Sequence, residues 1–213
     1  MLLWLVLIAA LCVYRVYSIL PSRRRRLTRS ETKALAVFLG SGGHTKEALT
    51  LISALDFARY RPRTYIISDG DTFSLQKAVD LENLKATATC PADYSLITVP
   101  RARRLHQPLY TIPPTALRAL LSCIYYLTFA SRPLGDVLIL NGPGTCLVLC
   151  IAVYINKFLG IAAPRLIYIE SFARVESLSL SGKLLHPLVD RFIVQWKQLA
   201  EKVKGAEFYE LLV

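Results

Sequence analysis

The chain has 213 residues, of which 54% are hydrophobic, 26 are Lys or Arg and 15 are Asp or Glu. This apolar content excludes an intrinsically disordered protein, and the length allows one sizeable domain that buries a core without disulfides. Residues 1–33 hold seven basic residues and one acidic residue, so six of the eleven net positive charges lie there. The mild excess in the rest of the chain argues against a nucleic-acid-binding face.

The first segment, residues 1–22, is predicted to be a transmembrane anchor. It is uncharged to Tyr14 and stays apolar past Arg15 to Leu20, which is long enough for a hydrocarbon core of about 30 Å. No basic residue precedes the run and no small-residue cleavage site follows it, so a cleaved signal peptide is not expected. The alternative is an interfacial helix that only dips into the membrane. The anchor includes Leu2, Trp4 and Leu20.

A basic linker, residues 23–33, follows the anchor. Because positively charged flanks stay on the cytosolic side of a membrane, the linker predicts a cytosolic position for the rest of the chain. Arg15, inside the apolar run, is expected to extend its side chain toward the same basic interface. The linker begins with Arg23, Arg24, Arg25 and Arg26.

From Ala34 onward, short apolar runs alternate with segments of helix length, which is typical of βαβ units. We therefore predict an α/β fold, a single doubly wound Rossmann-like domain over residues 34–213. The expected strands are residues 34–39, 64–68, 95–99, 137–140, 166–169 and 192–195. The expected helices lie near residues 45–56, 71–82, 114–131, 145–159 and 181–189.

The uncharged stretch 137–156 could be taken for a second membrane span. The glycine and proline turn at residues 141–144 favours a buried strand, a tight loop and a core helix instead. Five cysteines, at positions 12, 90, 123, 146 and 150, form no CxxC pair and no metal-ligand spacing with histidine. We expect buried thiols at Cys123, Cys146 and Cys150 in a reducing compartment, and no metal and no cofactor.

Ligands of doubly wound sheets bind beyond the carboxyl ends of the strands, and a glycine-rich loop follows the first strand. Its backbone N–H groups at a helix start favour a phosphate or diphosphate. The loop lacks the third glycine of a dinucleotide fingerprint and the Ser or Thr that ends a P-loop motif. His44 can act as a general base or bind a phosphate, or it can be a packing histidine. The loop comprises Gly40, Ser41, Gly42, Gly43, His44 and Thr45.

Two further loops follow strands and carry polar groups. After the fourth expected strand come Asn141, Gly142, Gly144 and Thr145, which can offer an amide and backbone donors or simply form a tight connection. After the fifth come Glu170, Ser171 and Arg174. Glu170 can accept a hydroxyl proton or bind a sugar hydroxyl, and Arg174 can hold a phosphate. The alternative is a surface ion pair between Glu170 and Arg174.

A basic segment precedes the third expected helix. It is either a solvated loop or a contact for anionic lipid head groups, which a membrane-anchored domain meets at high local concentration. Its residues are Arg101, Arg103, Arg104, His106 and Gln107.

Four segments, FLGSGGHTKEAL, PRAR, LNGPGTC and YIESFARVESLSLSGKLLHPLVDRFIVQW, closely resemble one family over nearly the whole chain. That family is the membrane-anchoring subunit of the dolichyl-diphosphate N-acetylglucosamine transferase of asparagine-linked glycosylation. The resemblance implies one lobe of a GT-B-type glycosyltransferase. This lobe provides the anchor and the acceptor side, with His44 and Glu170 as catalytic candidates and the three loops holding the acceptor and its diphosphate.

The resemblance also implies partners and a location. A small partner chain would carry the UDP-N-acetylglucosamine site, and the two chains together would add the second N-acetylglucosamine to the dolichyl-diphosphate-linked first one. This chain is expected to be inactive alone and to sit at the cytosolic face of the endoplasmic reticulum membrane, with which the nuclear envelope is continuous. Membrane lipid is a third partner, and no nucleic acid is expected.

The length agrees with a two-chain enzyme, because a two-lobed transferase needs two α/β domains of about 100–150 residues each. The apolar tail, about residues 204–213, is the expected docking segment for the partner; its alternative is an edge strand or helix packed on this domain. The resemblance leads us to expect a proline after Trp196 and a glycine before the final apolar residues, where this chain has Lys197 and Glu210. The tail residues are Phe208, Tyr209, Leu211, Leu212 and Val213.

Two other functions remain open from the sequence. One is a scaffold that only tethers a competent catalytic partner. The other is a membrane-anchored nucleotide-dependent oxidoreductase, with Asp69 in the place of a ribose-binding acid. Thr45, in the place of the third fingerprint glycine, disfavours the oxidoreductase.

Overall fold

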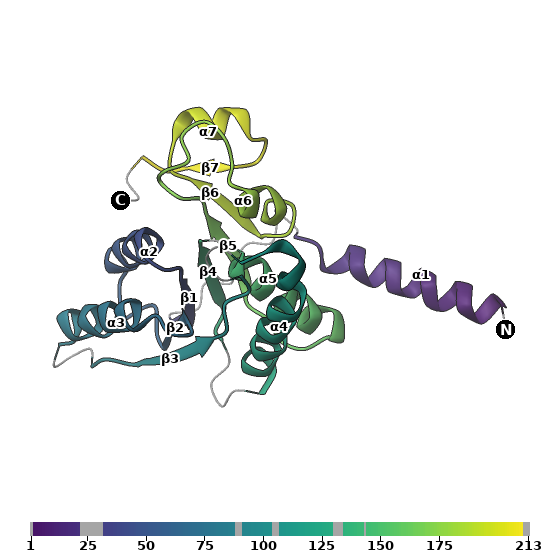
Figure 1. The fold of residues 1–213 in the computed structure, drawn as a ribbon, viewed down its shortest axis with the longest axis horizontal. Helices are drawn as coiled ribbons and strands as arrows, with labels where there is room; N and C mark the ends of the chain where they lie inside the picture. Colours follow the sequence, from purple (N-terminus) through teal and green to yellow (C-terminus); the bar gives the residue numbers. More distant parts are fainter. Residues whose placement is uncertain are drawn as a thin grey trace.

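The computed structural model describes residues 2–21, 32–87, 91–103, 107–129, 134–142 and 144–210. Its centre is a seven-stranded, all-parallel sheet with the strand order β3-β2-β1-β4-β5-β6-β7 (Figure 1). The strands are β1 (Leu35–Leu39), β2 (Arg63–Ser68), β3 (Tyr94–Val99), β4 (Val137–Asn141), β5 (Arg165–Ile169), β6 (Arg191–Val194) and β7 (Glu207–Phe208).

The strand order confirms the predicted doubly wound α/β domain. The chain winds outward from β1 to β3, returns to β4 beside β1 and then winds outward in the other direction. The direction of winding changes between β1 and β4, and ligands bind at such a switch point. The helices are α1 (Leu2–Ile19), α2 (Gly43–Ser53), α3 (Thr72–Lys85), η1 (Leu109–Thr111), α4 (Ile112–Phe129), α5 (Thr145–Leu159), α6 (Leu180–Leu185) and α7 (Lys197–Lys202).

Helices cover both faces of the sheet, with α2 and α3 on one side and α4 and α5 on the other (Figure 1). In β1, Val37 and Leu39 pack toward α2 and α3, while Ala36 and Phe38 pack toward α4 and α5. All five residues of β1 are buried, because successive side chains alternate between two covered faces. This double coverage explains why the strands appear in the sequence as continuous apolar runs.

The six expected strands lie within two residues of their predicted positions, whereas α7 was not predicted and β7 was considered only as the alternative for the tail. The helix expected over residues 181–189 ends early, at Leu185, because Pro187 has no backbone N–H with which to continue the helical hydrogen bonds. The uncharged stretch from residue 137 forms a buried strand and the core helix α5, as expected.

The buried-thiol prediction is confirmed for the cysteines of α4 and α5. Cys123, Cys146 and Cys150 are fully buried. Burial raises the pKa of Cys123 and of Cys150 to about 12, so these thiols stay protonated at neutral pH. Cys90 lies outside the described residues.

Helix α1 projects from the domain near α5 (Figure 1). Trp4 and most other large apolar side chains of α1 are exposed, as is Leu20 just beyond it. Arg15 does not extend toward a basic interface as expected: its Nε donates to the carbonyl of Phe158 at 3.0 Å and its Nη2 to that of Lys157 at 2.7 Å. It thereby binds the C-terminal end of α5, where helix carbonyls lack partners.

Within the described residues, no helix has the length and apolar character needed to cross a membrane. The predicted spanning helix is therefore not found: α1 has 18 residues and carries Arg15 within it. Leu2 begins α1, and the expected flank, Arg23 to Arg26, lies outside the described residues.

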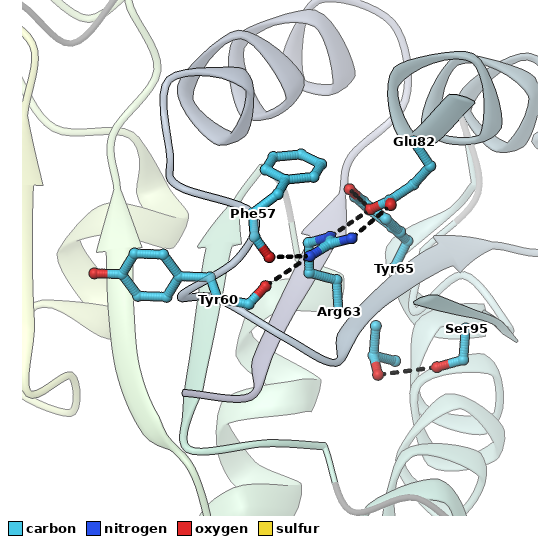
Figure 2. A network of polar contacts seen from close by, with 7 residues as sticks. Phe57, Tyr60, Arg63, Tyr65, Glu82 and Ser95 are labelled. Atoms are coloured by element: carbon cyan, nitrogen blue, oxygen red, sulfur yellow. Dashed lines mark hydrogen bonds and ion pairs between the residues drawn. The ribbon is translucent and has the colours of Figure 1, made fainter. Parts of the chain in front are cut away.

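A buried polar network joins α3 to the amino end of β2, at the edge of the sheet opposite the predicted loops (Figure 2). Arg63 Nε and Nη2 donate to the two oxygens of Glu82 at 2.6 and 2.7 Å, and its Nη1 donates to the carbonyls of Phe57 and Tyr60. The Tyr65 hydroxyl also donates to Glu82, at 2.7 Å. Burial, and then the charge of Glu82, raise the pKa of Tyr65 far above its usual range.

Candidate functional site

The three loops predicted from the sequence meet at one edge of the sheet. They follow β1, β4 and β5, and these strands are consecutive neighbours in the sheet. Leu39, the last residue of β1, pairs in register with Asn141, the last residue of β4. Parallel strands in register deliver their loops to the same edge, and this edge contains the switch point between β1 and β4.

Close backbone contact between the first two loops depends on glycine. A Cβ on Gly40 would lie 2.8 Å from His44 Cβ and 3.1 Å from the Asn141 carbonyl oxygen, so no larger residue fits there. Gly142 has φ +136°, a backbone region that favours glycine, and its Cβ position lies 3.4 Å from Gly40 Cα. The two loops therefore form one surface. Its exposed rim consists of Ser41, Gly42, Gly43 and Gly144.

A chain of hydrogen bonds connects the side chains of this surface. The distance between His44 Nδ1 and Asn141 Oδ1 is 2.9 Å, and Asn141 Nδ2 donates to Glu47 Oε2 at 3.1 Å. A carboxylate only accepts hydrogen bonds, so the Asn141 amide must turn its NH₂ toward Glu47 and its oxygen toward His44. His44 Nδ1 must then be the donor, which leaves Nε2 of the neutral imidazole with a free lone pair.

Glu47 also connects the third loop. Its Oε1 accepts from the Ser171 hydroxyl at 3.0 Å and from the Phe172 backbone N–H at 3.3 Å. This role of Glu47 was not predicted from the sequence, where Glu47 stands in place of the Ser or Thr of a P-loop motif. The usable signal was its position three residues after His44 in the first turns of α2, which puts both side chains on one helix face.

The two threonines of the predicted site face inward. Thr45 Oγ1 donates to the Gly40 carbonyl and lies 2.7 Å from Ser74 Oγ. Thr145 Oγ1 accepts from the backbone N–H of Ala102 at 3.3 Å. Both residues are buried, so these contacts position the loops and their hydroxyls do not line the exposed surface.

Glu170 lies beside this surface but is only 1% exposed. Its Oε2 accepts from the Ser179 backbone N–H at 2.9 Å and from the Ser179 hydroxyl at 3.0 Å, and its Oε1 accepts from the Ser171 N–H at 3.0 Å. A Cβ on Gly182 would overlap Oε2. The carboxylate therefore fixes the segment between Ser171 and Gly182, whereas Arg174 of the same loop is exposed.

The tail adopts in part the alternative considered for it, an edge strand. Phe208 belongs to β7 and pairs with Val194 of β6, and the exposed Tyr209 bonds through its hydroxyl to Arg191 and Glu207. Leu211, Leu212 and Val213 lie outside the described residues. A cavity of about 450 Å³ beside β7 is lined by Gln195, Trp196, Lys197, Gln198, Glu201, Phe208 and Glu210.

Trp196 connects this cavity with the candidate site. Its Nε1 donates to the Phe172 carbonyl at 2.7 Å, and the two rings lie 4.7 Å apart. The backbone N–H of Phe172 in turn donates to Glu47. Phe172 therefore connects Trp196, which lines the cavity beside the tail, to Glu47 of the His44 network.

Comparison with known proteins assigns the chain to a family. Residues 35–212 match the family described as "Oligosaccharide biosynthesis protein Alg14 like". Three similar proteins carry the name UDP-N-acetylglucosamine transferase subunit ALG14. The Cryptococcus neoformans protein is 46% identical (88% of this chain, 85% of the relative), the Schizosaccharomyces pombe protein 48% (83% and 81%) and the human protein 36% (92% and 89%).

Among solved structures, a Polygonum tinctorium UDP-glucosyltransferase complexed with 3,4-dichloroaniline shares 18% identity and a TM-score of 0.40, over 86% of this chain and 36% of that chain. That likeness is too distant to support a functional argument. The match over nearly all of the domain and the identity to fungal and animal relatives confirm the family expected from the four segments. The chain belongs to the Alg14-like family of oligosaccharide biosynthesis proteins.

Proposed function

We propose that this chain is the membrane-anchor and acceptor-binding subunit of a heteromeric UDP-N-acetylglucosamine transferase. The enzyme adds the second N-acetylglucosamine to dolichyl-diphosphate-N-acetylglucosamine during lipid-linked oligosaccharide synthesis for protein N-glycosylation. The observation that carries the proposal is the oriented His44–Asn141–Glu47 chain at the sheet's switch point. The relatives' shared name supports the transferase.

His44 acts as the general base in this proposal. The acceptor hydroxyl oxygen attacks the anomeric carbon of the donor sugar, the bond from that carbon to UDP breaks, and UDP leaves with the electron pair. The hydroxyl proton passes to His44 Nε2, because Nδ1 already donates to Asn141. Glu170 is a positioning residue that holds Ser171 and Ser179, and the backbone N–H groups of the exposed residues 41–43 bind a phosphate of the acceptor diphosphate.

The donor site belongs to the partner chain. The described domain has one sheet and one switch point, whereas a two-lobed transferase needs a second α/β domain. The small catalytic UDP-N-acetylglucosamine-binding subunit docks on the tail, through Phe208, Tyr209 and the three apolar residues after Glu210. The cavity beside Trp196 supports this position, because it offers partly apolar walls next to the tail.

Helix α1 holds the complex at the cytosolic face of the endoplasmic reticulum membrane. Its exposed side chains, among them Leu3, Trp4 and Ile8, are large and apolar, so their exposure to water is unfavourable. Burying them in lipid, with the basic residues 23–26 at the head groups, anchors the domain. Alkaline extraction of membranes tests the anchoring: the full chain stays in the pellet, and a chain that lacks residues 1–20 is released.

A transfer assay tests the catalytic role. The chain is co-purified with its partner from membranes, and transfer from UDP-N-acetylglucosamine to a dolichyl-diphosphate-linked acceptor is measured. His44→Ala is expected to lower kcat by about 10²–10⁴-fold, the usual worth of a general base, while the partner is still recruited. The exposed Arg59→Ala, on the loop before β2, is the control and keeps wild-type rates.

Wild-type kcat in His44→Ala would contradict the assigned base. The scaffold alternative predicts that unchanged rate, since a tether needs no histidine at the switch point. The oxidoreductase alternative predicts tight NAD binding by the purified chain, which family membership argues against.

A further inference from the structure

A second cavity lies at the carboxyl ends of β2 and β3, next to the glycine loops. Its volume is about 210 Å³. Asp69 and Gly70 follow β2, Pro100 and Arg101 follow β3, and Thr115 and Arg118 come from α4; together they form its lining. None of these residues has a part in the proposed proton transfer.

The charged groups of the cavity suit a phosphate. Arg101 and Arg118 come from two different parts of the chain and both line this cavity. Arg101 lies 4.0 Å from Asp71, whose carboxylate already accepts from the backbone N–H and the hydroxyl of Ser74. Asp69 contributes one carboxylate, so the lining residues carry a formal charge of +1, and Asp71, which is not part of the lining, offsets part of the charge of Arg101. Two guanidinium forks can hold phosphate oxygens with paired hydrogen bonds.

An exposed apolar stripe on α4 begins beside Arg118. Leu117, Leu121, Tyr125 and Phe129 follow one another at intervals of four residues and are 56–71% exposed, so they lie along one face of the helix. The stripe extends about 18 Å, because a helix rises 1.5 Å per residue. A cationic hollow at the start of an apolar stripe matches an amphiphile with an anionic head and a hydrocarbon chain.

The cavity is joined to the candidate site by hydrogen bonds. The backbone N–H of Ala102, next to Arg101, donates to Thr145 at the start of α5. On the other side, Asp71 binds Ser74, and Ser74 Oγ lies 2.7 Å from Thr45 Oγ1 in the first glycine loop. The cavity and the glycine loops therefore lie at the same edge of the sheet, beyond neighbouring strands.

We propose that this cavity binds a phosphate of the lipid-linked diphosphate acceptor, whose hydrocarbon chain lies along the α4 stripe. The inference rests on the proposed function and adds a subsite to it. The glycine loops hold the sugar and one phosphate, Arg101 and Arg118 hold the phosphate on the lipid side, and Leu117 and Leu121 contact the first part of the chain.

Steady-state kinetics of the co-purified complex in detergent micelles test the subsite. Arg118→Glu is expected to raise the KM for the lipid acceptor roughly ten-fold or more, since one charge-assisted contact is lost, with the KM for UDP-N-acetylglucosamine unchanged. Asp69→Asn is expected to lower the acceptor KM, because a repelling carboxylate is removed. Arg118→Lys is expected to raise the acceptor KM less than Arg118→Glu does, because lysine keeps the positive charge but loses the paired hydrogen bonds, and Arg59→Ala is the matched control. A higher acceptor KM in Arg118→Glu together with a lower one in Asp69→Asn would not arise if these residues only stabilised the fold.

Competition with simpler ligands tests the hydrocarbon path. Farnesyl diphosphate is expected to inhibit competitively with the acceptor and more strongly than inorganic diphosphate. Leu121→Ser reduces that difference, while the inhibition by inorganic diphosphate stays the same. Equal inhibition by the two compounds in the wild-type complex would overturn the role of α4.

Three outcomes separate failure of the subsite from failure of the proposed function. An active wild-type complex whose acceptor KM is unchanged in Arg118→Glu overturns the subsite alone. If Arg118→Glu loses binding to vesicles rich in anionic phospholipid while its acceptor KM is unchanged, the subsite is also overturned, because the cavity then binds bulk lipid. An inactive wild-type complex overturns the proposed function. In that case, farnesyl diphosphate binding by the full chain that is lost in Arg118→Glu would still support the subsite.

Discussion

At the scale of single residues, Glu47 determines which ring nitrogen of His44 carries the proton, although Asn141 lies between the two side chains. Glu47 can only accept, so it fixes the Asn141 amide, and the amide oxygen fixes the proton on His44 Nδ1. Asn141 is fully buried and cannot exchange these partners for water. Three side chains from α2 and β4 therefore fix the His44 tautomer with the proton on Nδ1, which leaves Nε2 free to accept a proton as a general base must.

Glu47→Gln tests this dependence. A glutamine amide can donate to Asn141, which allows the Asn141 amide to turn over, present its NH₂ to His44 and move the histidine proton to Nε2. We expect kcat for transfer to fall at least ten-fold with the KM for UDP-N-acetylglucosamine unchanged. Because both residues act through one proton, the effect should disappear in the His44→Ala background. Additive losses in the double variant would show that Glu47 acts independently of His44.

The sequence could indicate only part of this site. His44 and Asn141 follow strands in glycine turns and were found for that reason. Glu47 was missed because its partners Ser171 and Phe172 are more than 120 residues away in the chain, and that contact exists only in the folded sheet. Glu170 was expected to face a ligand, but its carboxylate accepts hydrogen bonds from the half-buried Ser179, which lies in a turn that has no apolar periodicity.

At the scale of elements, the buried Arg63–Glu82 pair determines how α3 sits on β2. Both side chains are nearly inaccessible, and Arg63 also stacks 4.1 Å from the centre of the Phe57 ring. The pair makes bidentate hydrogen bonds, and two backbone carbonyls accept from Nη1 of Arg63 (Figure 2). It lies at the amino edge of the sheet, so it contributes to the fold without touching the candidate site.

Arg63→Met is expected to lower the free energy of unfolding by about 3–5 kcal/mol, because Glu82 would be left buried without its cation. Arg63→Met combined with Glu82→Leu should recover part of that loss, since no uncompensated charge remains. Urea unfolding of the detergent-solubilised chain measures both variants, with Arg59→Ala as an exposed control that changes stability by less than about 0.5 kcal/mol. A double variant no more stable than the single one would contradict this account.

The elements found from the sequence are those with a strong local pattern. Every strand buried on both faces was predicted, because its apolar run is short and bounded by turns. The short α7 was missed and the two-residue β7 was only an alternative for the tail, because six and two residues carry too little periodicity and depend on packing against β6. For α1, the apolar composition predicted a helix correctly but not the contact of Arg15 with the end of α5.

At the scale of the whole molecule, the chain combines three surfaces. The carboxyl edge of the sheet holds the His44 network, the apolar side chains of α1 and α4 are exposed, and the tail beside Trp196 borders a cavity. Phe172 connects the tail to the network through Trp196 and Glu47. This arrangement suits a subunit whose site is completed, and not merely located, by its partner.

The most direct test of that claim is to fuse the partner to an unrelated membrane anchor and measure its transfer activity with and without this chain. The account predicts that the anchored partner alone transfers at least 100-fold more slowly than the complex. Adding this chain should restore the rate, and adding its His44→Ala variant should not. Full transfer by the anchored partner in the absence of this chain would contradict the account and reduce the chain to a tether.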